Sequence, residues 1–247
     1  GQKLFDGVSS LWCNVHGHRH AKLDSAIQEQ LQRVAHVTTL GMSCQTTDDL
    51  AKRLAELTPG DLGHVFFSSD GSSAVEAALK MARKFGHSKG IARPEVVVYE
   101  KSGWVSYGAC GLPYVLSGEI PRLERLVART PEEFRKQGVL VRTRHEVVDV
   151  DYELRTLTVH DHAEGRTFQD RFDHLVLATG ARPSLPPIPG TEQEGVYTLR
   201  TMEDGERLLK ALPQARRAAI LGAGYIGLEA ASVAAKVARH PILTVKA

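Results

Sequence analysis

AAILGAGYIGLE, residues 218–229, is the stretch that decides the fold: an apolar run breaks into Gly-x-Gly-x-x-Gly and an alanine-rich segment follows. In such a pattern Gly222 makes a tight turn, Gly224 leaves room for a pyrophosphate beside the backbone, and Gly227 lets the helix pack close to the strand. The anion lies at the helix N-terminus. The stretch therefore predicts a strand, a turn and a helix that bind a dinucleotide, with an ordinary glycine-rich turn as the alternative.

Composition narrows the class of protein and its partners. The chain has 247 residues, 42% hydrophobic and 24% charged, which is typical of one or two globular domains. Its 31 basic and 29 acidic side chains leave a net charge of +2, so we expect neither a nucleic acid nor a membrane as partner. The three cysteines have no metal-ligand spacing, which predicts no metal site and favours a reducing compartment, the cytoplasm. No apolar run reaches the roughly 18 residues that a membrane-spanning helix needs.

The first part of the chain predicts helices at residues 22–34 and 48–57, a strand at 64–68 and a helix at 74–85. A turn rich in glycine and serine joins that strand to the last helix. Its residues Gly71, Ser72 and Ser73 would place several N–H groups and hydroxyls at one point, which predicts an anion site. The simpler alternative is a serine that caps the helix.

Three stretches in this part carry a resemblance to a known family: DGVSSLW at 6–12, HGH at 16–18 and SDGSSAVEAALKMA at 69–82. They resemble the start of the class III aminotransferases of the biotin pathway. The resemblance implies that Gly71, Ser72 and Ser73 cradle the phosphate of pyridoxal phosphate (PLP) and that Trp12 lines the substrate pocket. The Schiff-base lysine of that family does not follow in this sequence. Lys89 has a similar setting, but it comes far too early in the chain to take that role.

From residue 95 the sequence predicts more strands than helices. We expect a buried strand at 96–100, a helix at 131–137 and an antiparallel meander built from 139–142, 146–150 and 154–160. A second buried strand is expected at 174–179, followed by a proline-rich connector and a helix at 202–212. After the glycine pattern comes a short strand at 241–245. The fold class is α/β: Rossmann-like βαβ units with a parallel sheet, plus a small antiparallel β-meander.

Residues 95–230 resemble the pyridine nucleotide-disulfide oxidoreductases, most closely the single-cysteine branch that contains coenzyme A-disulfide reductase and NADH oxidases. The resemblance implies that Glu100 binds the adenosine ribose of FAD and that Cys110 is the redox cysteine beside the flavin. A single cysteine there can cycle between a thiolate and a sulfenic acid or a mixed disulfide. The remaining implied site residues are Ala178, Thr179 and Gly180 at FAD, Gly222, Gly224 and Gly227 at the NAD(P)H pyrophosphate, and Glu229 near the junction of flavin and nicotinamide.

One part of this second family is missing. Its FAD glycine fingerprint should stand about twenty to thirty residues before Glu100, and the turn at residues 71–73 stands there instead. Both versions supply a strand, a phosphate turn, a helix and a strand, so the βαβ pattern is kept. A turn with one glycine suits a monophosphate better than a pyrophosphate.

The chain therefore reads as a composite: an aminotransferase-like segment at 1–94, an FAD-binding-like segment with the meander at 95–213, and a truncated NAD(P)-binding βαβ unit at 214–247. The function that fits most positions is a flavin- and NAD(P)H-dependent reductase of a small disulfide. Two alternatives stay open: a recombined or engineered α/β chimera without turnover, and a PLP-binding aminotransferase-like protein. Strand edges left open by the missing parts suggest self-association.

Overall fold

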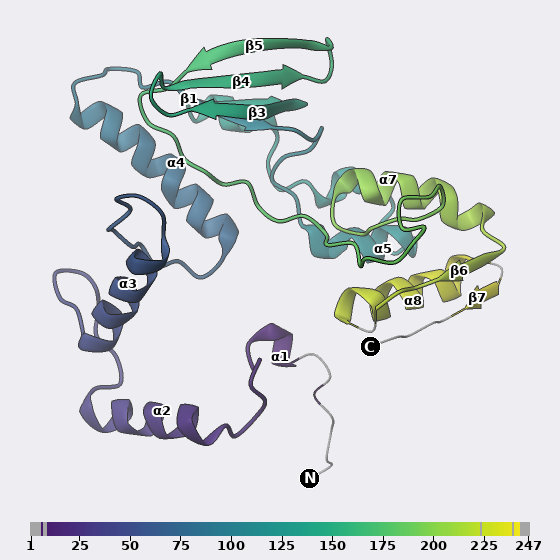
Figure 1. Cartoon of the computed structure of the whole chain (residues 1–247), viewed down its shortest axis with the longest axis horizontal. Coiled ribbons are helices and arrows are strands. Elements are labelled where there is room, and N and C mark those ends of the chain that lie inside the picture. The colour runs from purple at the N-terminus through teal and green to yellow at the C-terminus, as the bar shows by residue number, and fades with distance from the viewer. Residues whose placement is uncertain (1–5, 7–8, 223, 239, 243–247) are drawn as a thin grey trace. The chain divides into compact units, whose positions relative to one another are not determined.

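A computed structural model describes residues 6, 9–222, 224–238 and 240–242, but not the side chains of residues 11, 12 and 240–242. The chain divides into two compact units, Gly1–Ala74 and Val75–Ala247, and each is described by itself (Figure 1). No helix among the described residues combines the length and the apolar character needed to cross a membrane.

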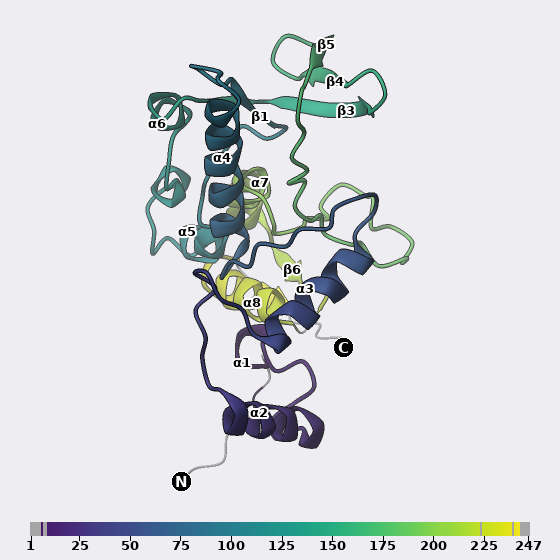
Figure 2. The same cartoon turned by 90° about the vertical axis from the view of Figure 1, so that its left-hand side faces the viewer.

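Helices make up the regular structure of the first unit: α1 (Ser9–Trp12), α2 (Ala21–Arg33), α3 (Gln45–Leu57) and the start of α4 (Gly71–Ser88). Figure 2 shows α2 and α3 as separate rods joined by an irregular segment. The helices predicted at 22–34 and 48–57 are confirmed, although neither buries a residue. The strand predicted at 64–68 is wrong, because these residues form irregular chain and Phe66 is 67% exposed.

A parallel pair of strands begins the second unit. β1 (Val96–Glu100) pairs with β2 (Val139–Thr143) in a register that joins Val96 to Val139 and Glu100 to Thr143. Helix α6 (Pro131–Lys136) precedes β2 and packs against it. The prediction that 139–142 belongs to the meander is therefore wrong. The long connection between the two strands, which includes α6, lets β2 return parallel to β1.

The antiparallel meander is built from β3 (His145–Asp151), β4 (Thr156–Asp161) and β5 (Arg166–Arg171), side by side in Figure 1. An aspartate closes each hairpin: Asp151 Oδ1 accepts from two backbone N–H groups at 2.9 and 2.8 Å, and Asp161 Oδ1 from two at 2.9 and 3.2 Å. The predicted meander exists, but its third strand is β5, which the sequence analysis missed.

The buried strand predicted at 174–179 does not form. Residues 172–216, all of them described, contain no strand, and Val176 and Leu177 are 58% and 64% exposed. In the strand order 3-2-1-4 of a dinucleotide-binding sheet, the first strand lies between the second and the fourth. If β1 is the second strand, residues 64–68 would be the first and 174–179 the fourth. Neither segment forms a strand, so among the described residues only the second and third strands of this order, β1 and β2, are paired.

The core of this unit gathers around short helices. α5 (Leu112–Leu116) follows the 3₁₀ turn η1 (Ala109–Gly111), and η2 (Leu123–Leu126) comes next. Helix α7 (Met202–Ala211), which confirms the helix predicted at 202–212, packs against α5 and η2. The buried side chains of this cluster are Leu112, Val115, Leu123 and Met202.

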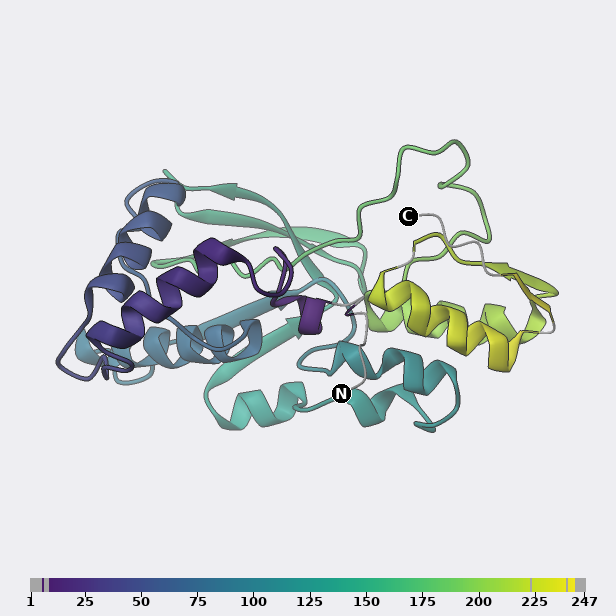
Figure 3. The same cartoon turned by 90° about the horizontal axis from the view of Figure 1, so that it is seen from below.

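A minimal βαβ unit follows the turn η3 (Leu212–Gln214). β6 (Arg217–Ala219) and β7 (His240–Ile242) pair in parallel, and α8 (Tyr225–Val237) connects them. In Figure 3 the yellow helix α8 runs beside these strands. The α/β class and the βαβ unit are thus confirmed. The end of the strand predicted at 241–245 lies outside the described residues.

Candidate dinucleotide and redox site

The three glycines of the turn before α8 have different surroundings. Gly222 has φ +112°, in the left-handed region that side chains disfavour. At Gly227 an added Cβ would lie 2.1 Å from the Gly222 carbonyl oxygen, so only glycine permits this approach of helix and turn. At Gly224 an added Cβ would meet nothing within 4 Å. The turn is therefore tight at one end, closely packed at the other and open in the middle.

Helix α8 starts from this turn without a side-chain cap. Gly224 is its N-cap residue, with φ −69° and ψ 178°, and makes no side-chain hydrogen bond because it has no side chain. The N-terminus of a 13-residue helix with an open glycine beside it suits a pyrophosphate. Among the described residues this is the turn that fits a dinucleotide phosphate best. Glu229 lies half-buried one turn further along α8.

Cys110 lies in η1 and is exposed to solvent. The turn leads directly into α5, whose Leu112 and Val115 are buried. α5 packs against both α7 and α8, and an ion pair of 2.7 Å joins Lys236 of α8 to Glu119. The helix that follows the cysteine turn thus packs against the helix that follows the glycine turn, and Cys110 itself is exposed.

Glu100 ends β1 and is half-buried. Its Oε1 accepts a hydrogen bond of 2.8 Å from the backbone N–H of Ser102, which fixes the carboxylate at the carboxyl end of the strand. In parallel sheets ligands bind at this end. The pKa of nearby Tyr107 is raised, first by burial and then by the negative charges of Glu203 and Glu100.

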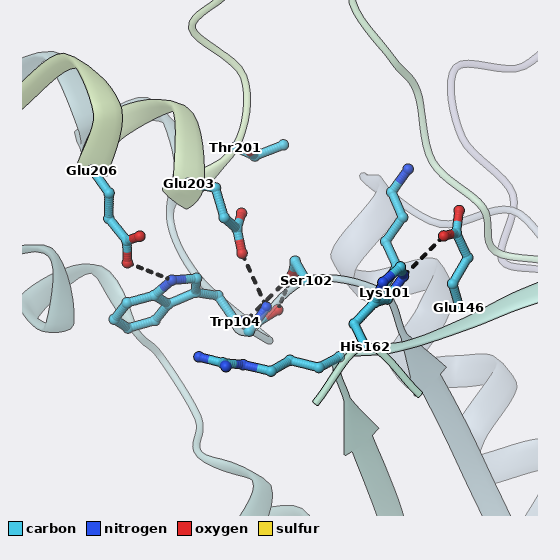
Figure 4. Close-up of a pocket in the computed structure, with 10 residues that line it drawn as sticks. Lys101, Ser102, Trp104, Glu146, His162, Thr201, Glu203 and Glu206 are labelled. Carbon is cyan, nitrogen blue, oxygen red and sulfur yellow. Dashed lines mark hydrogen bonds and ion pairs between the residues drawn. The ribbon is translucent and has the colours of Figure 1, made fainter. Parts of the chain in front are cut away.

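A cavity of about 490 Å³ is lined in part by residues 101–104, which directly follow Glu100 in the chain (Figure 4). Its three carboxylates all have partners: Glu146 pairs with His162 at 3.0 Å, and Glu203 and Glu206 accept hydrogen bonds from the loop after β1. This cavity was not predicted from the sequence. Its lining residues are Lys101, Ser102, Gly103, Trp104, Arg144, Glu146, His162, Thr201, Glu203 and Glu206.

The other predicted FAD residues lie in irregular chain. Ala178, Thr179 and Gly180 are exposed and belong to no sheet, and Gly180 has φ +67°. The other described helix of eight or more residues that begins at an open glycine is α4, at Gly71, and the Asp70 carboxylate already accepts from its first turn. The described residues therefore fit FAD only in part, through the carboxylate of Glu100.

The turn proposed for PLP is already occupied by a carboxylate. Asp70 Oδ1 accepts a 2.7 Å hydrogen bond from the N–H of Ser73, and this bond lowers the pKa of Asp70. Asp70, not a serine, caps α4, so Gly71, Ser72 and Ser73 surround a negative charge that would repel a phosphate. The side chain of Trp12 lies outside the described part of the chain. Within that part, no cluster of three or more His, Cys, Asp or Glu side chains could hold a metal ion.

Two family models match the chain. The model described as pyridine nucleotide-disulphide oxidoreductase matches residues 70–247, and the model of class-III aminotransferases matches residues 1–104. The composite predicted from the sequence is confirmed. The two matches overlap from residue 70 to residue 104, which contains α4 and β1.

Curated relatives divide in the same way. An NADH oxidase of Methanocaldococcus jannaschii is 39% identical over 140 residues, 56% of this chain and 31% of that protein. An adenosylmethionine-8-amino-7-oxononanoate aminotransferase of Aquifex aeolicus is 50% identical over 98 residues, 40% of this chain and 22% of that protein. The chain thus spans less than a third of the length of either relative.

Among solved structures, an NAD-dependent persulfide reductase from A. fulgidus is similar with a TM-score of 0.58 and 32% identity, over 68% of this chain and 32% of that one. The water-forming NADH oxidase from Lactobacillus brevis, bound to NADH, gives a TM-score of 0.57 and 29% identity, over 66% and 36% of the two chains. The family model covers well over half of the sequence, and the glycine turn and Cys110 lie within the matched residues. This chain belongs to the pyridine nucleotide-disulphide oxidoreductase family, and its first part is similar to class-III aminotransferases.

Proposed function

We propose that the chain is an NAD(P)H-dependent oxidoreductase fragment that acts on a small disulfide through Cys110, with FAD as its second cofactor. The observation that carries the proposal is the packing of α5, which follows Cys110, against α8, which starts at the glycine turn. One core therefore supports both an accessible thiol and a turn with room for a dinucleotide phosphate. The relatives' names point to the same chemistry, since they include NADH oxidases and a coenzyme A disulfide reductase.

The chemistry of Cys110 follows from its exposure. Its thiolate attacks one sulfur of a disulfide, forms a mixed disulfide and releases the other half as a thiolate. NAD(P)H, when bound, would supply the two electrons and the hydrogen that cleave the mixed disulfide, so that Cys110 would return as a thiolate and the second half would leave as a thiol. Gly222, Gly224 and Gly227 would hold the NAD(P)H pyrophosphate, with Glu229 one turn along the helix. Because the described residues fit FAD only in part, we assign no step to the flavin.

The three-part division at residues 94 and 213 belongs to the same proposal. The segment 95–213 contains Glu100, Cys110 and the meander, and 214–247 contains the βαβ unit of the glycine turn. The aminotransferase-like segment contributes no phosphate site to this proposal, because Asp70 occupies the start of α4.

A chimera without turnover is the second candidate, and one specific observation favours it. Residues 174–179, which include two of the residues expected to contact FAD, form no strand and are largely exposed. A site whose sheet lacks this strand has lost part of the surface that would bind the cofactor.

The test is the visible absorption spectrum of the purified chain, before and after FAD and PLP are added separately. The proposal predicts a bound flavin spectrum that NADH or NADPH bleaches, and NAD(P)H consumption that depends on a small disulfide. That consumption should disappear in Cys110→Ser and persist in Cys13→Ser, which removes another exposed cysteine. A colourless protein that binds neither cofactor would support the second candidate, whereas a PLP spectrum would revive the aminotransferase alternative.

A further inference from the structure

The loop that joins Glu100 to the cysteine turn, residues 101–108, begins with a tight internal network. The N–H of Ser102 donates to Glu100 Oε1 at 2.8 Å, and the Ser102 hydroxyl donates to the Trp104 carbonyl oxygen at 2.8 Å. The Ser102 carbonyl accepts from the N–H of Arg144 at 2.8 Å. The direction of the Glu100 carboxylate therefore depends on how this loop is held.

Helix α7, about a hundred residues later, holds the middle of the loop. Glu203 Oε1 accepts from the Gly103 N–H at 2.9 Å, and Glu206 Oε1 accepts from the indole N–H of Trp104 at 3.2 Å (Figure 4). The two glutamates are three positions apart, so they lie on the same face of α7. Both half-buried carboxylates point to the loop rather than to a cation.

Helix α7 is itself firmly placed. Asp204 is 3% exposed, and its Oδ2 accepts from two backbone N–H groups at 2.9 and 3.1 Å and from the Thr198 hydroxyl at 3.1 Å. Met202 is fully buried in the core. A Cβ at Gly205 would lie 2.9 Å from Leu112 Cδ2, so α7 approaches α5 closely. A rigid support of this kind can fix a loop that has little structure of its own.

We propose that Glu203 is a positioning residue: by accepting from Gly103 it holds the 101–108 loop so that the Glu100 carboxylate keeps the direction needed to bind a nucleotide ribose. This inference rests on the proposed function for the role of Glu100. Tyr107, in the same loop, lies near both carboxylates: after burial, the charges of Glu203 and Glu100 raise its pKa. Trp104 and Tyr107 also pack against the buried cluster that contains Met202.

The first measurement uses no cofactor: amide hydrogen exchange at Gly103 in the full chain. Glu203→Ala removes the acceptor, and we expect exchange about 10- to 100-fold faster, the range set by one hydrogen bond to a charged group. Glu203→Gln keeps an acceptor oxygen and should stay within about 2-fold of the wild type. The matched control is Glu132→Ala, which removes an exposed carboxylate from the first turn of α6 and should change nothing at Gly103.

The second measurement is a titration of the same variants with FAD. We expect Glu203→Ala to raise the Kd about 5-fold and Glu203→Gln to bind like the wild type. The inference is overturned if exchange at Gly103 is unchanged in Glu203→Ala, or if exchange accelerates equally in both Glu203 variants or equally in the meander. It is also overturned if the loop loosens in Glu203→Ala while the Kd for FAD stays unchanged. If the wild type binds no FAD, the proposed function and the ribose role of Glu100 fail together, whereas the exchange rates still decide whether α7 holds the loop.

Discussion

Replacing Gly227 by alanine should destabilise the βαβ unit. The new Cβ would lie 2.1 Å from the Gly222 carbonyl oxygen and 3.0 Å from its carbonyl carbon, both rigid backbone atoms. Non-bonded heavy atoms are favourably placed at roughly 3.5 Å, so the start of α8 must move away by about 1.4 Å to relieve the contact fully. Helix α8 buries Ala231, Val233 and Ala234, and such a shift loosens their packing. We expect a loss of about 1–3 kcal/mol in the free energy of unfolding, the usual cost of overpacking.

Urea unfolding followed by circular dichroism measures this loss, and Gly224→Asp is the matched control. At Gly224 an added Cβ meets nothing within 4 Å, and φ −69° suits any residue. Aspartate is a favourable N-cap, so stability should stay within about 1 kcal/mol of the wild type or rise. Its charge would repel a pyrophosphate, and NADH affinity should fall more than about tenfold. Wild-type stability in Gly227→Ala would refute the packing argument, and retained NADH affinity in Gly224→Asp would refute the assignment of the turn.

Three further predictions concern single side chains. Asp204→Ala should lower the free energy of unfolding by about 3 kcal/mol in urea titrations, because two backbone N–H groups and the Thr198 hydroxyl lose their acceptor. Arg207 pairs with Asp204 through an exposed guanidinium, so Arg207→Ala should cost under about 1 kcal/mol. The Cys44 thiol has a pKa lowered to about 7, chiefly by a hydrogen bond with the Thr46 hydroxyl. In a variant that keeps only Cys44, the rate of alkylation should therefore be half-maximal near pH 7, and this midpoint should move to higher pH in Thr46→Val. An unshifted midpoint would refute the role of Thr46. Burial acts to raise the pKa of Asp161, but backbone N–H groups and neighbouring cations outweigh burial and lower this pKa below 3.8. The free energy of unfolding of the wild type should therefore exceed that of Asp161→Asn by its full amount at neutral pH, and this difference should shrink as the pH falls below 3.8. A difference that grows in acid would contradict this.

Elements with strong local signals were predicted well from the sequence. The helix at 202–212 and the unit around 218–229 formed as expected, because a Thr201–Asp204 capping box and a glycine pattern specify their starts locally. The failures are strands whose pairing is not local. An apolar run such as 174–179 can be a strand only beside a neighbour, and the register of β2 depends on a partner about forty residues away.

The glycine turn and Cys110 could be found from the sequence, because both lie in compact motifs. The support of the Glu100 loop could not, since Glu203 and Gly103 are a hundred residues apart and nothing in either stretch points to the other. The available signal was indirect: the capping box places Glu203 in the first turn of α7. Which face of that turn meets the loop is decided by Met202, whose side chain must enter the core.

The two helix starts that the sequence offered as phosphate sites differ in one physical respect. At α4 the chain supplies its own anion, because Asp70 accepts from the Ser73 N–H, and a phosphate would have to displace a hydrogen-bonded carboxylate. At α8 the cap is Gly224, which supplies no side chain and leaves the space before the helix open. A helix N-terminus that already holds a negative charge gives little further stabilisation to a bound phosphate, whereas an N-terminus without a side-chain cap can stabilise the phosphate fully. Of the two helix starts that the sequence suggested as phosphate sites, the geometry therefore favours the dinucleotide at α8 over the PLP phosphate at α4.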